Sequence, residues 1–384
     1  MAFLLPLVFP VLSGGEAGPV FVAAEKIWTG GGTLWRGFVR IEEGKIREVR
    51  EEAEAPSDAR VFSFPGAWVT SGLIDTHAYL GGRADLVEPT FSMTPRARAL
   101  DVFEPGHRDF TAAVRSGITT TLLSPRDENL VGGLAAAVKT AGAGRIVREE
   151  ALLKMSLGEA VLDPDREPTS RQGALALLRT ALRRAAEEGP DAPLARLARG
   201  ELVALVHTGR NDEVFAAGRF ASEFGLKIAL VHAPLSGEMA AFLKDRQIGV
   251  VCGPFDASTP LRALRTPGLL SEAGVAIAFC TDGPGHDPET LRLSAALAVR
   301  AGLPPDRALQ ALTSGAASLL GLVDRVGSIE PGRDADLVVW SGPPLDLASR
   351  VLAVFVDGEP VVDVRTESRR PRRPGDPIPA EASP

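Results

Sequence analysis

Three histidines and one aspartate stand where apolar, strand-like runs of the sequence end. His77 follows the run 69–76, His207 follows 202–206, His232 follows 228–231, and Asp282 follows 275–281. Imidazole nitrogens and carboxylate oxygens are ligands that zinc and similar divalent metals take in proteins. We therefore predict that these four side chains meet around a metal ion, although they are far apart along the chain.

Alternating strand-like and helical segments between residues 67 and 324 predict the fold that would position these side chains. A helix is expected over about 170–188, for example, because leucines recur on one face and Gly189-Pro190 ends the pattern. This alternation over about 250 residues favours an α/β fold, a closed (β/α)8 TIM barrel, with an open doubly wound sheet as the alternative. The carboxyl ends of barrel strands meet at one mouth, where the four residues would converge.

The two ends of the chain show strand-like patterns without the helical segments that alternate with strands in the middle. Residues 18–66 and 325–365 contain strand-like runs and turn signals such as Asp357-Gly358, so we predict one small accessory β-sandwich built from both. Residues 1–17 contain an apolar, signal-like segment without a positively charged start, which favours export to the periplasm; a hydrophobic first strand of a cytoplasmic protein is the alternative. The tail 366–384, with arginines among prolines, is predicted to be disordered.

Composition excludes some functional classes. The chain has 384 residues, a net charge of −7 and 45% hydrophobic residues. This acidic balance argues against nucleic-acid binding, and no apolar run is long enough to predict a membrane span. Cys252 and Cys280 lie in apolar runs and are expected to be buried core residues. We therefore expect a small-molecule substrate as the partner.

Five stretches carry recognisable motifs: SGLIDTHAYLG (71–81), the two strands that end in histidine, TDGP (281–284) and GSIEPGRDADLVVW (327–340). Together they resemble the amidohydrolase superfamily, and most closely its imidazolonepropionase-like branch. The resemblance implies a barrel with a β-sandwich made from both termini, and hydrolysis of a C–N bond in an amide or cyclic amide. It also implies one divalent metal ion, zinc or alternatively manganese or iron, and a homo-oligomer.

Position 79 departs from the family pattern. The resemblance predicts His-x-His after the first barrel strand, whereas this chain has His77-Ala78-Tyr79. Three outcomes remain open. A single metal is held by the other ligands and catalysis is kept, or Tyr79 contributes through its hydroxyl or as a phenolate, or the metal site has decayed and the protein binds without turnover.

Further residues are secondary candidates. Lys139 and Lys154 could each be a carbamylated lysine bridging two metals, with an ordinary ion pair to nearby acids as the alternative. His107 and His286, in loops, and also Tyr79 and Lys154, could contact the substrate.

The combined prediction is a metal-dependent hydrolase. A metal-activated water would attack the substrate carbonyl, and Asp282 would act as both ligand and proton shuttle to the departing nitrogen. The alternative is a catalytically impaired homologue that acts as a binding or scaffold protein.

Overall fold

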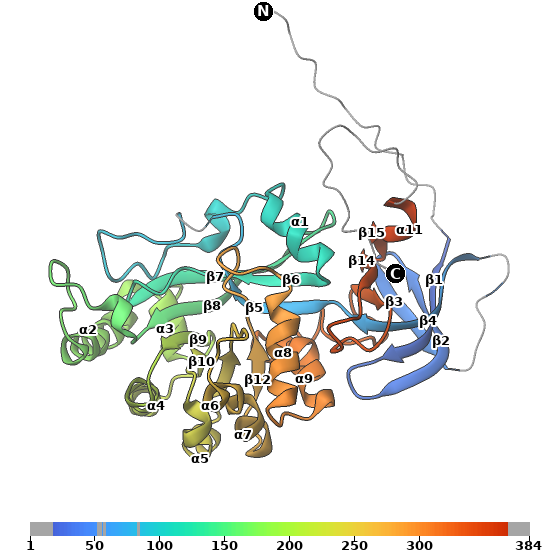
Figure 1. Ribbon diagram of the computed structural model, residues 1–384. Coiled ribbons are helices and arrows are strands. Elements are labelled where there is room, and N and C mark those ends of the chain that lie inside the picture. Colours follow the sequence, from blue (N-terminus) through green and yellow to red (C-terminus); the bar gives the residue numbers. More distant parts are fainter. Residues whose placement is uncertain (1–17, 52–55, 57–58, 83–84, 368–384) are drawn as a thin grey trace, which may run out of the picture.

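The computed structural model describes residues 18–51, 56, 59–82 and 85–367 (Figure 1). The predicted signal-like segment 1–17 lies outside the described residues, as does the predicted disordered tail apart from residues 366 and 367. Those two residues end the short helix α11 (Val364–Glu367). Within the described part of the chain, no helix combines the length and apolarity needed to cross a membrane.

Eight strands form a nearly closed barrel with helices outside it, which confirms the predicted fold class. The strands are hydrogen-bonded in chain order: β5 (Leu73–Ala78), β6 (Ile118–Leu123), β7 (Val131–Lys139), β8 (Ile146–Ser156), β9 (Ala204–Thr208), β10 (Ile228–His232), β11 (Gly249–Cys252) and β12 (Ile277–Phe279). Side chains alternate along them between the barrel interior and the outer, helix-covered side. Leu205 and Val231 belong to the interior cluster, for example, and Val206 and Leu230 to the outer one.

One strand departs from the expected parallel arrangement. β7 pairs antiparallel with both β6 and β8, whereas the other neighbouring barrel strands pair in parallel. The physical reason is the length of the connections, residues 124–130 and 140–145. A parallel crossover needs about a dozen residues or more, so these short links can only turn the chain back on itself.

Helices follow most of the parallel strands and lie along the outside of the barrel (Figure 1). The α-helices are α1 (Arg108–Arg115), α2 (Arg171–Arg184), α3 (Pro193–Ala198), α4 (Asn211–Phe224), α5 (Ala240–Asp245), α6 (Leu261–Leu264), α7 (Thr266–Glu272), α8 (Thr290–Arg300), α9 (Pro305–Leu312) and α10 (Ser314–Leu319). Short 3-10 turns are η1 (Ala99–Val102), η2 (Glu159–Val161), η3 (Ala185–Glu188) and η4 (Ser236–Met239). The helix expected over 170–188 is present as α2 continued by η3.

A separate seven-stranded sheet, built from both ends of the chain, lies beside the barrel (Figure 1). Its strands in spatial order are β15 (Glu359–Asp363), β14 (Val351–Val356), β13 (Leu337–Trp340), β4 (Arg60–Ser71), β1 (Val20–Trp28), β2 (Thr33–Glu42) and β3 (Lys45–Arg50). Antiparallel pairing of β13 with β4 joins the two ends. The accessory β unit expected from both termini is therefore present, with its strands hydrogen-bonded into one continuous sheet.

Gly72 is the single residue between β4 of this sheet and β5 of the barrel. A Cβ atom at this position would lie 1.8 Å from the Thr119 hydroxyl oxygen, so no side chain fits without displacing β6. The direct passage from β4 into β5 fixes the first barrel strand, and with it His77, relative to the accessory sheet.

Barrel closure between β12 and β5 uses individual hydrogen bonds instead of a strand ladder. The Thr76 hydroxyl donates to the carbonyl oxygen of Phe279 (2.8 Å), and the Asp282 amide donates to the carbonyl of His77 (3.1 Å). The Asp75 carboxylate accepts from the hydroxyl and amide of Thr281. Burial raises the pKa of Asp75 to about 7. We call this set of bonds the seam.

Candidate metal centre

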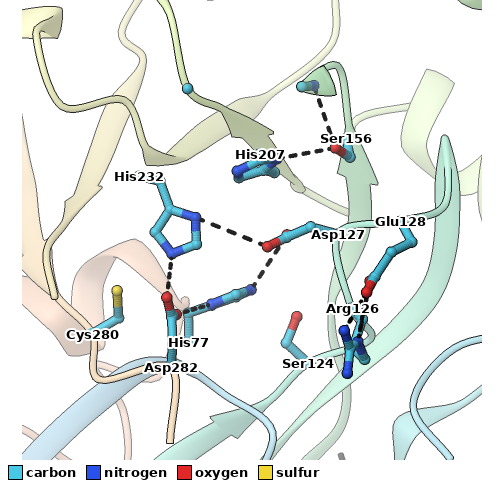
Figure 2. Close-up of polar contacts among 12 residues, drawn as sticks. His77, Ser124, Arg126, Asp127, Glu128, Ser156, His207, His232, Cys280 and Asp282 are labelled. Atoms are coloured by element: carbon cyan, nitrogen blue, oxygen red, sulfur yellow. Dashed lines mark hydrogen bonds and ion pairs between the residues drawn. The ribbon is translucent and has the colours of Figure 1, made fainter. Parts of the chain in front are cut away.

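The structure brings the four predicted ligands together at the carboxyl ends of the barrel strands (Figure 2). His77 comes from β5, His207 from β9 and His232 from the end of β10, while Asp282 lies three residues beyond β12. Ring centroids are 5.3 Å apart for His77 and His232, and 5.1 Å apart for His207 and His232. The predicted convergence is therefore present, while the role of each residue as a ligand stays a prediction.

Two of these residues, His232 and Asp282, have a left-handed backbone conformation. Val231 faces the barrel interior, so regular alternation would send His232 outward, but φ at His232 is 74°. Asp282 also has a positive φ, 54°. A left-handed conformation costs a non-glycine residue about 1–2 kcal/mol. At His232 it ends β10 and reorients the side chain towards the other predicted ligands.

Asp282 contacts two of the histidines. His77 Nδ1 lies 2.8 Å from Asp282 Oδ1, and His232 Nε2 lies 2.7 Å from Oδ2. Burial alone would raise the pKa of the Asp282 carboxyl, but His232 and His77 outweigh burial and hold it well below its usual value. This carboxylate is therefore ionised, as a metal ligand or proton acceptor must be.

The histidines differ in their preferred charge. Burial lowers the pKa of His207 to about 3, and burial followed by the charge of Lys154 lowers the pKa of His77. Both rings are thus neutral near pH 7 and can offer a lone pair to a metal. Burial opposes protonation of His232 as well, but Asp282 outweighs it and raises the pKa of that ring.

Asp127, which the sequence analysis did not single out, completes the cluster. It lies in the loop between β6 and β7, with Oδ1 2.5 Å from Lys154 Nζ and Oδ2 accepting a hydrogen bond of 3.0 Å from the Tyr79 hydroxyl. Burial alone would raise the pKa of Asp127, but Lys154 and the histidines hold it well below its usual value. The available signal was its position, four residues after the end of a barrel strand.

Two secondary candidates, Tyr79 and Lys154, lie in the centre. The Tyr79 ring packs edge-on against His77 with centroids 5.0 Å apart. Burial raises the pKa of the Tyr79 phenol, which favours the neutral hydroxyl over a phenolate ligand. Lys154, on β8, is fully buried and points at Asp127, in keeping with an ion pair.

His207 is oriented by its neighbours on and after β8. Its Nδ1 lies 3.1 Å from the Ser156 hydroxyl oxygen. Gly158 packs against the same ring so closely that a Cβ atom there would lie 2.7 Å from His207 Nδ1. The absence of a side chain at Gly158 therefore determines where this imidazole can stand.

A cavity of about 380 Å³ opens onto the centre. It is lined by Tyr79, Arg126, Asp127, Glu128, Ala160, His207, Asp282, Gly285 and His286. His286 is thus placed where the sequence analysis expected a substrate contact, although contact itself stays a prediction. His107 is not among the lining residues: its ring accepts a hydrogen bond from the Asp109 amide at the start of α1.

Lys139, the other lysine considered, lies away from this mouth. Its ammonium group is buried against three aspartates beside the accessory sheet: Asp334 at 2.9 Å, Asp336 at 3.0 Å, and Asp357. Lys139 is the last residue of β7, and β7 runs opposite to its neighbours. Its carboxyl end is therefore at the other end of the barrel, and Lys139 cannot bridge metals at the mouth.

The side chains present fit a divalent metal ion. Ligand atoms lie within 4.8 Å of one another in two overlapping groups, one of Asp127, His207 and His232, the other of His77, His232, Cys280 and Asp282. One buried ring nitrogen that faces Asp127, His77 Nε2, makes no hydrogen bond to any described residue, and Asp127 Oδ1 on the other side of that gap is paired with Lys154. Cys280 and Cys252 are buried as expected, and burial raises the pKa of both thiols, so Cys280 stays a poor donor.

Comparison with known proteins decides the family. An amidohydrolase from Thermotoga maritima has the same fold with a TM-score of 0.80 and 30% sequence identity, and the match covers 90% of this chain and all of that one. The chain belongs to the amidohydrolase superfamily. The amidohydrolase family model matches residues 235–363 of this amidohydrolase, and the predicted resemblance is confirmed.

Curated relatives are more distant. Amidohydrolase tasK of Hapsidospora irregularis is 25% identical over 93% of this chain, which spans only 45% of that protein's length. An imidazolonepropionase of Rhizorhabdus wittichii is 27% identical over 83% of this chain and 92% of its own length. By family and site, the chain is an amidohydrolase-type hydrolase with a candidate His/Asp metal site.

Proposed function

We propose that this amidohydrolase hydrolyses a C–N bond in an amide or cyclic amide, using one divalent metal ion. The observation that carries the proposal is the meeting of three histidines and two ionised carboxylates at the barrel mouth, with the buried His77 Nε2 left without a hydrogen bond to any described residue. The relatives named imidazolonepropionase favour a cyclic amide among substrates of this class.

Zinc suits the donor set best, with manganese or iron as alternatives, and His77, His207, His232 and Asp282 are the predicted ligands. When bound, such an ion supplies a Lewis acid for the substrate carbonyl and lowers the pKa of a water molecule. Asp282 is ionised and lines the cavity, so it can take the proton of the attacking water and deliver it to the departing nitrogen.

Two of the remaining cavity residues would contact the substrate. His286 and the Tyr79 hydroxyl provide polar contacts. Arg126 is paired with Glu128, so its charge contributes less to selecting a negatively charged substrate. A cavity of about 380 Å³ accommodates a small molecule. Lys154 keeps Asp127 ionised, and the short contact between the two favours an ammonium ion over a carbamylated lysine.

A catalytically impaired binding or scaffold protein is the second candidate, because a phenol stands where the family pattern has a histidine. Metal analysis of the purified protein separates the two. Near-stoichiometric zinc, manganese or iron, lost in His207→Ala, supports the hydrolase. A protein that takes up no metal under loading conditions contradicts it.

Substrate class requires a screen of the metal-loaded protein. Cyclic imides, N-acyl amino acids, dipeptides and lactones form a suitable panel, with His207→Ala as the inactive control. Turnover of lactones alone would contradict C–N specificity. We also propose a homo-oligomer on the family resemblance, and size-exclusion chromatography with light scattering tests it.

A further inference from the structure

Two carboxylates approach the same pair of histidine rings from opposite sides (Figure 2). Asp282 contacts His77 Nδ1 and His232 Nε2. Asp127 faces the other nitrogen of each ring, with Oδ1 3.9 Å from His77 Nε2 and Oδ2 3.9 Å from His232 Nδ1. The two aspartates therefore stand in unequal relations to the rings, one in contact and one separated by a gap.

A separation of 3.9 Å is too long for a hydrogen bond. It suits two ligands of one ion, because donors about 2.1 Å from a metal stand roughly 3.4 Å apart in a tetrahedral site and up to about 4.2 Å apart when opposed. His207 also belongs to this side, since its ligand atom lies within 4.8 Å of those of Asp127 and His232.

We propose that Asp127 is a metal ligand that replaces the second histidine of the His-x-His motif, and that Tyr79 holds it in place. Tyr79 stands where that histidine would be, and its hydroxyl reaches Asp127. Tyr79 therefore removes one ligand from the His-x-His motif, but its hydroxyl donates the hydrogen bond that positions Asp127. This inference rests on the proposed function, since both require a metal at the mouth.

The remaining contacts of Asp127 leave it able to bind an ion. Each carboxylate oxygen has two lone-pair directions. Tyr79 occupies one on Oδ2, and Lys154 lies against Oδ1. The other directions are available on the side of the histidines, where His77 Nε2 and His232 Nδ1 each lie 3.9 Å away, beyond hydrogen-bonding distance.

The same geometry refines the role of Asp282. An ion bound to His77 Nε2 and His232 Nδ1 leaves Asp282 as partner of the opposite ring nitrogens. Metal-bound histidines usually donate their other ring N–H to a carboxylate, a backbone carbonyl or a water, which fixes the ring and its tautomer. Asp282 would then orient the two rings and transfer the proton, without binding the ion itself.

Metal affinity of matched variants tests the inference, with isothermal titration using Zn²⁺ and visible absorption of the Co²⁺ form as measurements. Asp127→Asn should weaken affinity about 100-fold and change the Co²⁺ spectrum, while Tyr79→Phe should weaken it about tenfold. Glu128→Gln is the matched control, because it removes the adjacent carboxylate, which pairs with Arg126, and should bind zinc as the wild type does.

A rescue variant guards against misfolding. Asp127→Asn combined with Tyr79→His restores the second histidine and should recover most of the lost affinity. Unchanged zinc affinity in Asp127→Asn would overturn the role of Asp127 and leave the proposed function intact. A wild-type protein that binds no metal would overturn both.

Discussion

Two buried ionic clusters lie at opposite ends of the barrel, and each is built on one lysine. The mouth cluster comprises Lys154, Asp127, Asp282, His77 and His232. The junction cluster, beside the accessory sheet, comprises Lys139, Lys45, Arg325, Asp334, Asp336 and Asp357. They use similar residues but differ in how completely their charges are matched.

The junction cluster is balanced, with three basic groups against three carboxylates. Among its described members, Asp336 Oδ2 is the one side-chain atom found buried without a hydrogen bond. The mouth cluster has one lysine against two aspartates when its histidines are neutral, and it leaves His77 Nε2 without a hydrogen bond to any described residue. A balanced cluster can hold a structure together by itself, whereas the mouth lacks one cation unless His232 is protonated, which its raised pKa favours, or a metal ion binds. That difference separates a structural site from a candidate binding site.

Asp282→Asn should have the largest effect. Loss of proton transfer should lower kcat/KM on any substrate found in the screen by about 10²–10⁴-fold. If Asp127 rather than Asp282 binds the ion, zinc content should stay near the wild-type value, as measured by elemental analysis. Loss of zinc together with activity would instead make Asp282 a direct ligand. The proposed difference, in which Asp127 binds the ion and Asp282 does not, would then be wrong.

Replacing each lysine by methionine compares the clusters directly. Lys139→Met leaves three buried or half-buried aspartates facing one another, so the free energy of unfolding should fall by about 3–5 kcal/mol whether or not metal is present. Lys154→Met should cost less when zinc is bound, since the ion can compensate Asp127. Urea unfolding with and without zinc measures both. If both variants lose the same free energy of unfolding with and without zinc, the mouth cluster has no cation deficit for the metal to fill.

Gly158→Ala should act on the mouth alone. The added Cβ would collide with the His207 ring, so zinc affinity should fall by about tenfold, a loss typical of disturbed ligand orientation. Gly106→Ala is the matched control, because nothing lies within 4 Å of a Cβ there and φ is not positive. Titration with Zn²⁺ compares the two, and equal affinities would mean that the ring can move aside.

The smallest expected effect is a pH dependence at the junction. Burial raises the pKa of Asp336 to about 6 from an ordinary value of 3.8. The folded protein then holds a proton that the unfolded chain releases, so this group makes stability fall as pH rises from about 4 to about 6. Asp336→Asn should remove that fall, about 1–2 kcal/mol across the interval. Urea unfolding of variant and wild type at several pH values measures the difference, and parallel profiles would contradict it.

The sequence predicts the positions that follow from strand patterning. His207, His232 and Asp282 each end an apolar run, and a barrel brings such positions to one mouth, so their convergence could be inferred before any coordinates. Asp127 could not, because it lies in a polar loop, Arg126-Asp127-Glu128-Asn129, where a carboxylate is unremarkable. Its place against the histidines depends on the loop path, which local sequence does not encode.

The sequence could not tell which of the two candidate lysines lies at the barrel mouth, because it does not show the direction of each strand. Lys139 and Lys154 both lie in apolar strand-like runs, and nothing in those runs says which way a strand points. The short connections on either side of β7 carry that information, because they force it antiparallel and send Lys139 to the junction. The accessory sheet was predictable as a unit from both termini, but its single-sheet form depends on long-range pairing of β4 with β13.

The seam between β12 and β5 has a consequence for how the barrel opens. Elsewhere in the described barrel, neighbouring strands share a ladder of backbone bonds, but this edge relies on a few bonds that involve the residues just before His77 and Asp282. Local opening of the barrel should therefore begin between β12 and β5, and this opening would move His77 away from the other predicted ligands. An ion bound by both His77 and His232 would hold β5 in place. Metal binding would then favour the closed barrel, and the closed barrel would favour metal binding.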